Sequence, residues 1–165
     1  LSSAALAIGS DISPMLIRVA KMLSRISPKL GTQKLDSKWI SRDSAEVAKY
    51  DNDPLVYRGG IPARTGAEMM RAMEIVTKGT PRIKYPLLIV HGTADKIVDI
   101  EGSMQMHARA GSADKTLRLF DEGYHESHNE PNKAEVLNLY TDWMDERVAG
   151  SAEMPESHHK RRGKK

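Results

Sequence analysis

An aspartate and a histidine each follow a predicted buried strand, which is where open α/β sheets gather their functional groups. Asp95 follows the strand 87–90 through a four-residue loop, and His125 follows the strand 116–120 in the same way. If the two strands are neighbours, the two loops are adjacent. A carboxylate there could fix the tautomer of the imidazole and stabilise the imidazolium that forms when the histidine takes a proton from a nucleophile. The order Asp before His is that of a hydrolase of this architecture.

The elements that must position this pair alternate along the second half of the chain. Residues 85–90 form a continuous apolar run, which is typical of a strand buried on both faces. A helix is predicted over 101–110 and closed by Gly111, and a last helix is predicted after Asn132, with Glu135 at its third position. Strand, helix, strand and helix with short links predict an α/β fold with a parallel sheet and flanking helices.

The first half of the chain is predicted to be a helical insertion. The apolar run 4–8 reads as the end of a core strand, and a basic amphipathic helix is then predicted from an N-cap at Ser13 to Ile26. Further helices are expected over 43–50 and after a capping box at 65–68. We therefore expect the end of a core strand in 1–10, a helical cap in 11–80, a C-terminal α/β core in 81–150 and a disordered basic tail in 151–165.

Three segments resemble one family in the same order. "PLLIVHGTADKIVD" and "GSADKTLRLFDEGYHESHNEP" are similar to the acid and histidine segments of the monoacylglycerol lipase and lysophospholipase branch of the α/β hydrolases, which are serine aminopeptidase-like enzymes. "LDSKWISRDSAEVAKYDNDPLVYRGGI" resembles the cap of that branch. The resemblance implies an α/β-hydrolase fold with a Ser-Asp-His triad and no cofactor. It also implies a substrate that is a monoacylglycerol or a related single-chain lipid ester.

The resemblance assigns roles to five residues. Asp95 matches the catalytic acid, and His125 matches the catalytic base. His128 and Tyr50 match positions at the polar, glycerol-accepting end of the pocket, and Leu35 matches an apolar position in the acyl channel. His91, just before Gly92, is interpreted as a strand-end residue packed beneath the loop.

The chain departs from the family pattern at the nucleophile, because none of its serines lies in a G-x-S-x-G motif. We therefore expect these residues to be the C-terminal portion of a hydrolase and to lack esterase activity on their own. The alternatives are a lysophospholipase, another esterase or a peptidase of the same fold, or a catalytically inactive module that binds lipid or protein. An upstream G-x-S-x-G would separate the enzymes from the inactive module.

Composition limits the remaining functions. The chain has 165 residues and a net charge of +3, but residues 1–150 carry 20 basic and 20 acidic side chains, so no nucleic-acid partner is expected. The absence of cysteine permits a cytoplasmic location. The histidines lack a ligand spacing such as H-E-x-x-H, so no metal is expected. The helix 13–26 could rest peripherally on a membrane through its apolar stripe, or it could pack that stripe on its own domain.

Overall fold

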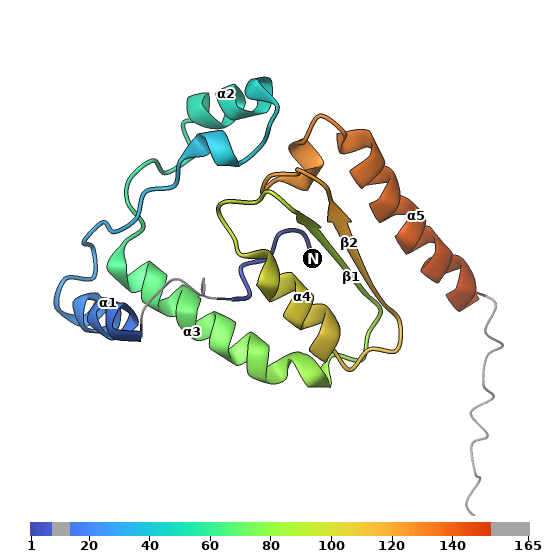
Figure 1. The fold of residues 1–165 in the computed structure, drawn as a ribbon, viewed down its shortest axis with the longest axis horizontal. Coiled ribbons are helices and arrows are strands. Elements are labelled where there is room, and N and C mark those ends of the chain that lie inside the picture. The colour runs from blue at the N-terminus through green and yellow to red at the C-terminus, as the bar shows by residue number, and fades with distance from the viewer. Residues whose placement is uncertain (8–13, 153–165) are drawn as a thin grey trace, which may run out of the picture.

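The computed structural model describes residues 1–7 and 14–152. Helices and strands follow one another in the order helix, helix, helix, strand, helix, strand, helix (Figure 1). Three short 3-10 helices, η1 (Ser37–Trp39), η2 (Thr80–Arg82) and η3 (Ser127–Asn129), lie between them. The principal elements are α1 (Pro14–Ile26), α2 (Ser44–Asn52), α3 (Ala63–Gly79), β1 (Leu87–Gly92), α4 (Ile100–Arg109), β2 (Lys115–Phe120) and α5 (Lys133–Ala152).

The two strands form a parallel pair. Their register runs from Leu87 opposite Lys115 to Gly92 opposite Phe120. On the other edge of β1, the Val90 amide donates to the Leu1 carbonyl (2.8 Å) and the Ser3 amide donates to the Val90 carbonyl (2.9 Å). Residues 1–3 therefore extend the sheet beyond β1, and the predicted α/β fold with a parallel sheet is confirmed.

Helices cover both faces of the strand pair, as the continuous apolar run of β1 predicts. Leu88 and Val90 point to one face, where they meet Phe120 and Val136 of α5 in the buried core. The residue between them, Ile89, is also fully buried, and the next residue on its face, His91, contacts α4. Helices α4 and α5 lie on opposite sides of the strands (Figure 1).

The helices of the predicted cap, α1, α2 and α3, lie to one side of the sheet, with α1 alongside α3 (Figure 1). The predicted helices are present, and Asp43 caps α2 by accepting a hydrogen bond from the Ala45 amide at 2.9 Å. Between residues 14 and 80 the structure contains no strand beyond a single antiparallel bridge, which joins Gly31 to Pro62.

The predicted capping box at 65–68 is wrong, because α3 begins at Ala63 and its N-cap, Pro62, makes no side-chain hydrogen bond. The first amides of the helix are satisfied by another segment. The Ala63 amide donates to the Leu30 carbonyl (2.8 Å) and the Arg64 amide to the Pro28 carbonyl (3.1 Å). Tertiary contacts thus fill the role that a capping side chain fills in an isolated helix.

The predicted strand over 4–8 is also displaced. Pairing with β1 involves residues 1–3 and ends where Ser3 takes a positive φ of 40°, and residues 4–7 form no strand. The apolar run approaches α4 instead: a Cβ built at Gly102 would lie 3.1 Å from the Leu6 Cβ and 2.8 Å from the Ala7 nitrogen. The predicted N-cap Ser13, residue 8 and most of the predicted tail (153–165) lie outside the described residues.

Candidate active site

The loops that follow β1 and β2 are bonded to each other along their backbones. The Thr93 amide donates to the Phe120 carbonyl (2.9 Å), and the Ala94 amide donates to the Gly123 carbonyl (3.0 Å). The Thr93 hydroxyl donates to Asp121 (3.1 Å) and accepts from the Glu122 amide (2.8 Å). The predicted adjacency of the two loops is therefore present, and it is fixed by main-chain contacts.

Gly92 permits this close approach. A Cβ at Gly92 would lie 2.1 Å from the carbonyl oxygen of Gly123, a distance that real side chains do not reach. Glu122 has a φ of 54°, in the left-handed region, and turns the chain from β2 into the loop. The two glycines let the backbones touch, so the side chains that follow them come together.

Asp95 and His125 meet across these loops. The Nδ1 atom of His125 lies 2.9 Å from Oδ2 of Asp95. The carboxylate can only accept, so Nδ1 carries the proton and Nε2 of the neutral ring is left with a free lone pair. Asp95 has a fully buried side chain, whereas that of His125 is 25% exposed. This arrangement is a buried anion that orients a partly accessible base.

Asp95 is held as an anion by four donors. Burial alone would raise the pKa of Asp95, but hydrogen bonds from His125 and His91 and from the Val98 and Ile97 amides outweigh it and hold that pKa far below the usual range. The two amides bind Oδ1 at 3.0 and 2.8 Å. The carboxylate therefore stays charged at neutral pH and can stabilise an imidazolium on His125.

His91 is a buried strand-end residue, as the sequence predicts, and it also contacts Asp95, which the sequence interpretation does not include. Its Nε2 atom lies 3.2 Å from the same Asp95 oxygen that binds His125, and 3.3 Å from the Val98 carbonyl oxygen. Both neighbours are acceptors, so Nε2 carries the proton and Nδ1 accepts from the Ser103 hydroxyl at 2.7 Å. His91 and Ser103 are both completely buried. The available signal was a polar side chain ending an apolar strand, four residues before the acid.

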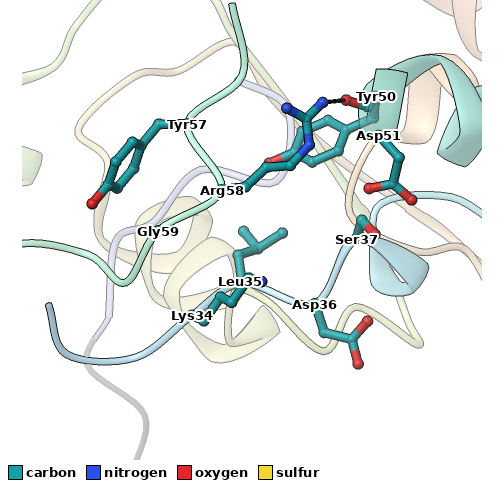
Figure 2. Close-up of a pocket in the computed structure, with 9 residues that line it drawn as sticks. All are labelled: Lys34, Leu35, Asp36, Ser37, Tyr50, Asp51, Tyr57, Arg58 and Gly59. Carbon is teal, nitrogen blue, oxygen red and sulfur yellow. Dashed lines mark hydrogen bonds between the residues drawn. The ribbon is translucent and has the colours of Figure 1, made fainter. Parts of the chain in front are cut away.

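The other predicted site residues lie apart from this pair. Leu35 and Tyr50 share a cavity of about 390 Å³ in the cap, which neither Asp95 nor His125 lines (Figure 2). Arg58 extends across this cavity and donates to the main-chain carbonyls of Tyr50 (2.9 Å) and Asp53 (2.8 Å). His128 is exposed on η3. The structure thus brings the predicted acid and base together. It places two of the three predicted substrate contacts, Leu35 and Tyr50, in a separate cavity.

The described residues contain neither a cluster of metal ligands nor a membrane-spanning helix. In ranges 1–7 and 14–152, no three histidine, aspartate or glutamate side chains form a group that could hold a metal ion. Every helix in those ranges is too short or too polar to cross a membrane.

Comparison with known proteins gives a consistent family signal. Residues 1–132 match the family described as serine aminopeptidase, S33. The chain is 33% identical over 144 residues to a monoacylglycerol lipase of Mycolicibacterium smegmatis, covering 87% of this chain and 51% of that protein. It is 31% identical over 153 residues to the monoglyceride lipase of Mus musculus, covering 92% and 50%. The chain spans about half the length of these relatives.

Solved structures agree with the sequence relatives. The monoacylglycerol lipase of Paleococcus ferrophilus superposes with a TM-score of 0.77 at 35% identity, over 87% of this chain and 56% of that one. A soluble variant of monoglyceride lipase from Saccharomyces cerevisiae, in complex with a substrate analog, gives a TM-score of 0.70 at 26% identity, over 88% and 54%.

Proposed function

Because the chain belongs to the serine aminopeptidase S33 family of α/β hydrolases, we propose that the protein is a serine ester hydrolase that cleaves monoacylglycerols or related single-chain lipid esters. The observation that carries the proposal is the hydrogen bond between Asp95 and His125 at the ends of adjacent parallel strands. The names of the relatives support an ester of glycerol as the substrate.

The geometry supports a two-step acyl transfer. His125 Nε2 would take the proton of a serine hydroxyl as its oxygen attacks the ester carbonyl, while Asp95 stabilises the resulting imidazolium. The imidazolium would then protonate the departing glycerol oxygen, which leaves an acyl-serine. In the second step His125 would take a proton from water, the hydroxide would attack the acyl carbonyl, and the proton would return to the serine as the fatty acid leaves.

We propose that the nucleophilic serine belongs to a part of the protein outside these 165 residues, since no serine among them lies in G-x-S-x-G. Its partner here would be His125, whose Nε2 is unoccupied by Asp95. His128, Tyr50 and Leu35 are proposed substrate contacts, with the first two toward the glycerol and Leu35 toward the acyl chain.

The function is tested with the full-length protein. Turnover of monoacylglycerols, loss of turnover with a fluorophosphonate and covalent labelling of one serine are the expected results. Preference for lysophospholipids or aminoacyl amides would identify a different specificity of the same fold. Failure to label any serine would instead identify an inactive binding module.

We also propose that the cap contacts lipid surfaces through α1, which carries two apolar stripes. Ile17, Ala20 and Leu23 line an apolar cavity of about 410 Å³ together with residues of α3, so this stripe packs within the cap. A second stripe faces outward, because the side chains of Met15 and Ile26 are 75% and 73% exposed. Arg18 and Arg25 add positive charge to the same helix, which favours anionic headgroups, whereas Lys21 pairs with Glu74 at 3.2 Å.

A further inference from the structure

A segment of the cap runs beside the loop that carries His125. The Glu126 amide donates to the Ile40 carbonyl at 2.7 Å, and the His125 amide donates to the Trp39 carbonyl at 3.4 Å. One residue further along the cap, the Ser41 hydroxyl donates to the Asn129 carbonyl at 2.7 Å. Main-chain groups of the proposed base and of residues after it are therefore bonded to the cap, whereas Gly123 before it is bonded to Ala94 of the loop after β1.

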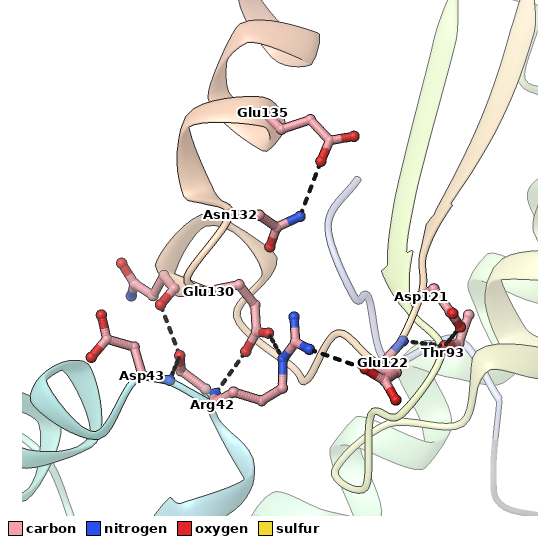
Figure 3. A network of polar contacts seen from close by, with 10 residues as sticks. Arg42, Asp43, Thr93, Asp121, Glu122, Glu130, Asn132 and Glu135 are labelled. Carbon is pink, nitrogen blue, oxygen red and sulfur yellow. Dashed lines mark hydrogen bonds and ion pairs between the residues drawn. The ribbon is translucent and has the colours of Figure 1, made fainter.

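Arg42 ends this segment and binds both ends of the histidine loop. Its main-chain amide donates to Oε1 of Glu130 at 2.8 Å, and its side-chain Nε donates to Oε2 of the same carboxylate (Figure 3). Its Nη1 lies 3.7 Å from Glu122, which precedes His125 by three residues. Arg42 thus spans the loop from its beginning at Glu122 to its end at Glu130.

Burial makes the pair with Glu130 the stronger of the two contacts. The side chain of Glu130 is 1% exposed and that of Arg42 is 32% exposed, whereas Glu122 is 81% exposed. Both oxygens of Glu130 are bound by Arg42, so a carboxylate that would be costly to bury alone is satisfied. Removing the Arg42 side chain would leave the buried carboxylate of Glu130 without its cation, which is far more damaging than losing a surface pair.

An aromatic contact adds to these polar contacts, and together they form a clamp between segment 39–42 of the cap and the loop 122–130. The rings of Trp39 and Tyr124 lie 5.3 Å apart between centroids, at an interplanar angle of 55°. Tyr124 immediately precedes His125, so the cap also holds the residue before the proposed base. By contrast, the hydrogen bond of the His125 amide itself, at 3.4 Å, is long. The position of His125 therefore depends on the neighbours that the cap secures.

We propose that Arg42 and Glu130 are positioning residues, which lock segment 39–42 of the cap to the loop 122–130 and so fix the orientation of His125. For its kinetic consequence this inference rests on the proposed hydrolase function. The structural coupling itself does not depend on any activity. A change in the cap would be transmitted to the base through this clamp.

The chain offers a matched control for an ordinary link between cap and core. Lys133 at the start of α5 pairs with Glu46 of α2 at 3.0 Å, and it is 47% exposed. This pair also joins the cap to the core, but neither residue lies in the loop 122–130. Lys133→Ala therefore removes one side-chain contact between cap and core and keeps the main-chain hydrogen bond from the Lys133 amide to the Glu130 carbonyl (2.9 Å).

Amide hydrogen exchange tests the coupling in the full-length protein. In Arg42→Ala we expect exchange at Glu126 and His125 to become at least about tenfold faster, while Val90 in β1 is unchanged. Glu130→Gln keeps an acceptor for the Arg42 amide and should give a smaller increase at the same two amides. Arg42→Lys, which retains the charge, should restore part of the protection. Equal exchange at Glu126 in Arg42→Ala and Lys133→Ala would overturn the proposal, because the clamp would then be an ordinary anchor.

Kinetics provide the second readout. Positioning predicts that Glu130→Gln lowers kcat by about tenfold or more with little change in KM, since the base would be misaligned in the transition state. Lys133→Ala should leave kcat unaltered. Loss of protection at Glu126 in a protein without esterase activity would refute the proposed function and support the clamp. Full activity in Glu130→Gln with unchanged exchange would refute the clamp alone.

Discussion

The core and the cap of this protein are held by different interactions. In the core, Ile89, Val90 and Val136 are completely buried between strands and helices. In the predicted cap, α1 leaves Met15 and Ile26 about three-quarters exposed, and the link to the core near His125 combines polar contacts around Arg42 and Glu130 with one ring contact, between Trp39 and Tyr124. Apolar burial is non-directional, and here it gives Asp95 and His125 a rigid support. Directional polar contacts instead give the cap a defined but separable attachment.

The largest expected effect falls on the hydrogen-bonded pair Asp95 and His125. In the full-length protein, Asp95→Asn and His125→Ala should each lower kcat by about 10³–10⁴-fold, because the base would lose its tautomer or be absent. Turnover of a monoacylglycerol measures the loss, and circular dichroism checks that the fold is intact. Retention of most activity by either variant would assign catalysis to other residues.

Packing in the core should show the next largest effect. Ile89→Ala removes buried methyl groups from a fully buried site and is expected to lower the free energy of unfolding by about 2–5 kcal/mol. Denaturant unfolding of the full-length protein gives the value. A loss below about 1 kcal/mol, which is the scale of a conservative core change, would mean that the core is less tightly packed than the structure indicates.

His91 should show an intermediate effect on stability. His91→Leu removes a hydrogen bond to the buried carboxylate of Asp95 and leaves Ser103 without its partner. Such a bond to a charged group contributes about 1.5–3 kcal/mol, so a destabilisation of that size is expected in denaturant unfolding. Ser103→Ala keeps the His91–Asp95 contact and should cost less. Equal costs for the two variants would argue against a role of His91 on the acid.

Lowering the pH should reduce the free energy of unfolding through Asp95. The folded-state pKa of Asp95 is lowered, so its contribution to stability is fully present above its unfolded pKa of about 3.9 and is lost as pH falls toward the folded value. Wild-type protein should therefore lose more unfolding free energy than Asp95→Asn between pH 6 and pH 3, roughly the window around that unfolded pKa. If the free energy of unfolding changed equally with pH in the two proteins, the lowered pKa assigned to Asp95 would be contradicted.

The smallest effect on stability is expected at the exposed stripe of the cap. Met15→Ser combined with Met22→Ser should change the free energy of unfolding by less than about 0.5 kcal/mol per site, because both side chains are more than half exposed. The same variant should bind anionic liposomes less well in cosedimentation. Ala20→Ser on the packed stripe is the control, and unchanged liposome binding by the double variant would restrict α1 to packing within the cap.

The sequence predicted the core more accurately than the cap boundaries, for physical reasons. The continuous apolar run of β1 and the Asp-then-His order depend on local pattern, and both the sheet and the contact between Asp95 and His125 followed from them. The start of α3 depends instead on carbonyls of Pro28 and Leu30, which are distant in sequence. No local sequence pattern marks a helix N-terminus whose amides are satisfied by distant carbonyls, so the predicted capping box is misplaced.

The candidate site also combines features that the local sequence predicts with features that depend on the tertiary fold. His91 was interpreted as a packing residue because its burial could be predicted from the strand, but its hydrogen bond to Asp95 depends on how the loop folds back. The pairing of Arg42 with Glu130 joins residues 88 positions apart and leaves no periodic trace in the sequence. Contacts of this kind emerge only from the tertiary fold.

The close approach of Gly92 to Gly123 limits how this site can evolve. A larger residue at Gly92 cannot be accommodated by a small adjustment, because the obstruction is a backbone carbonyl rather than a flexible side chain. The spacing between acid and base therefore cannot drift through a series of mild substitutions at this point. Exposed side chains of the predicted cap, such as Met15 and Ile26, meet no such backbone obstruction and can change while the spacing of Asp95 and His125 is kept.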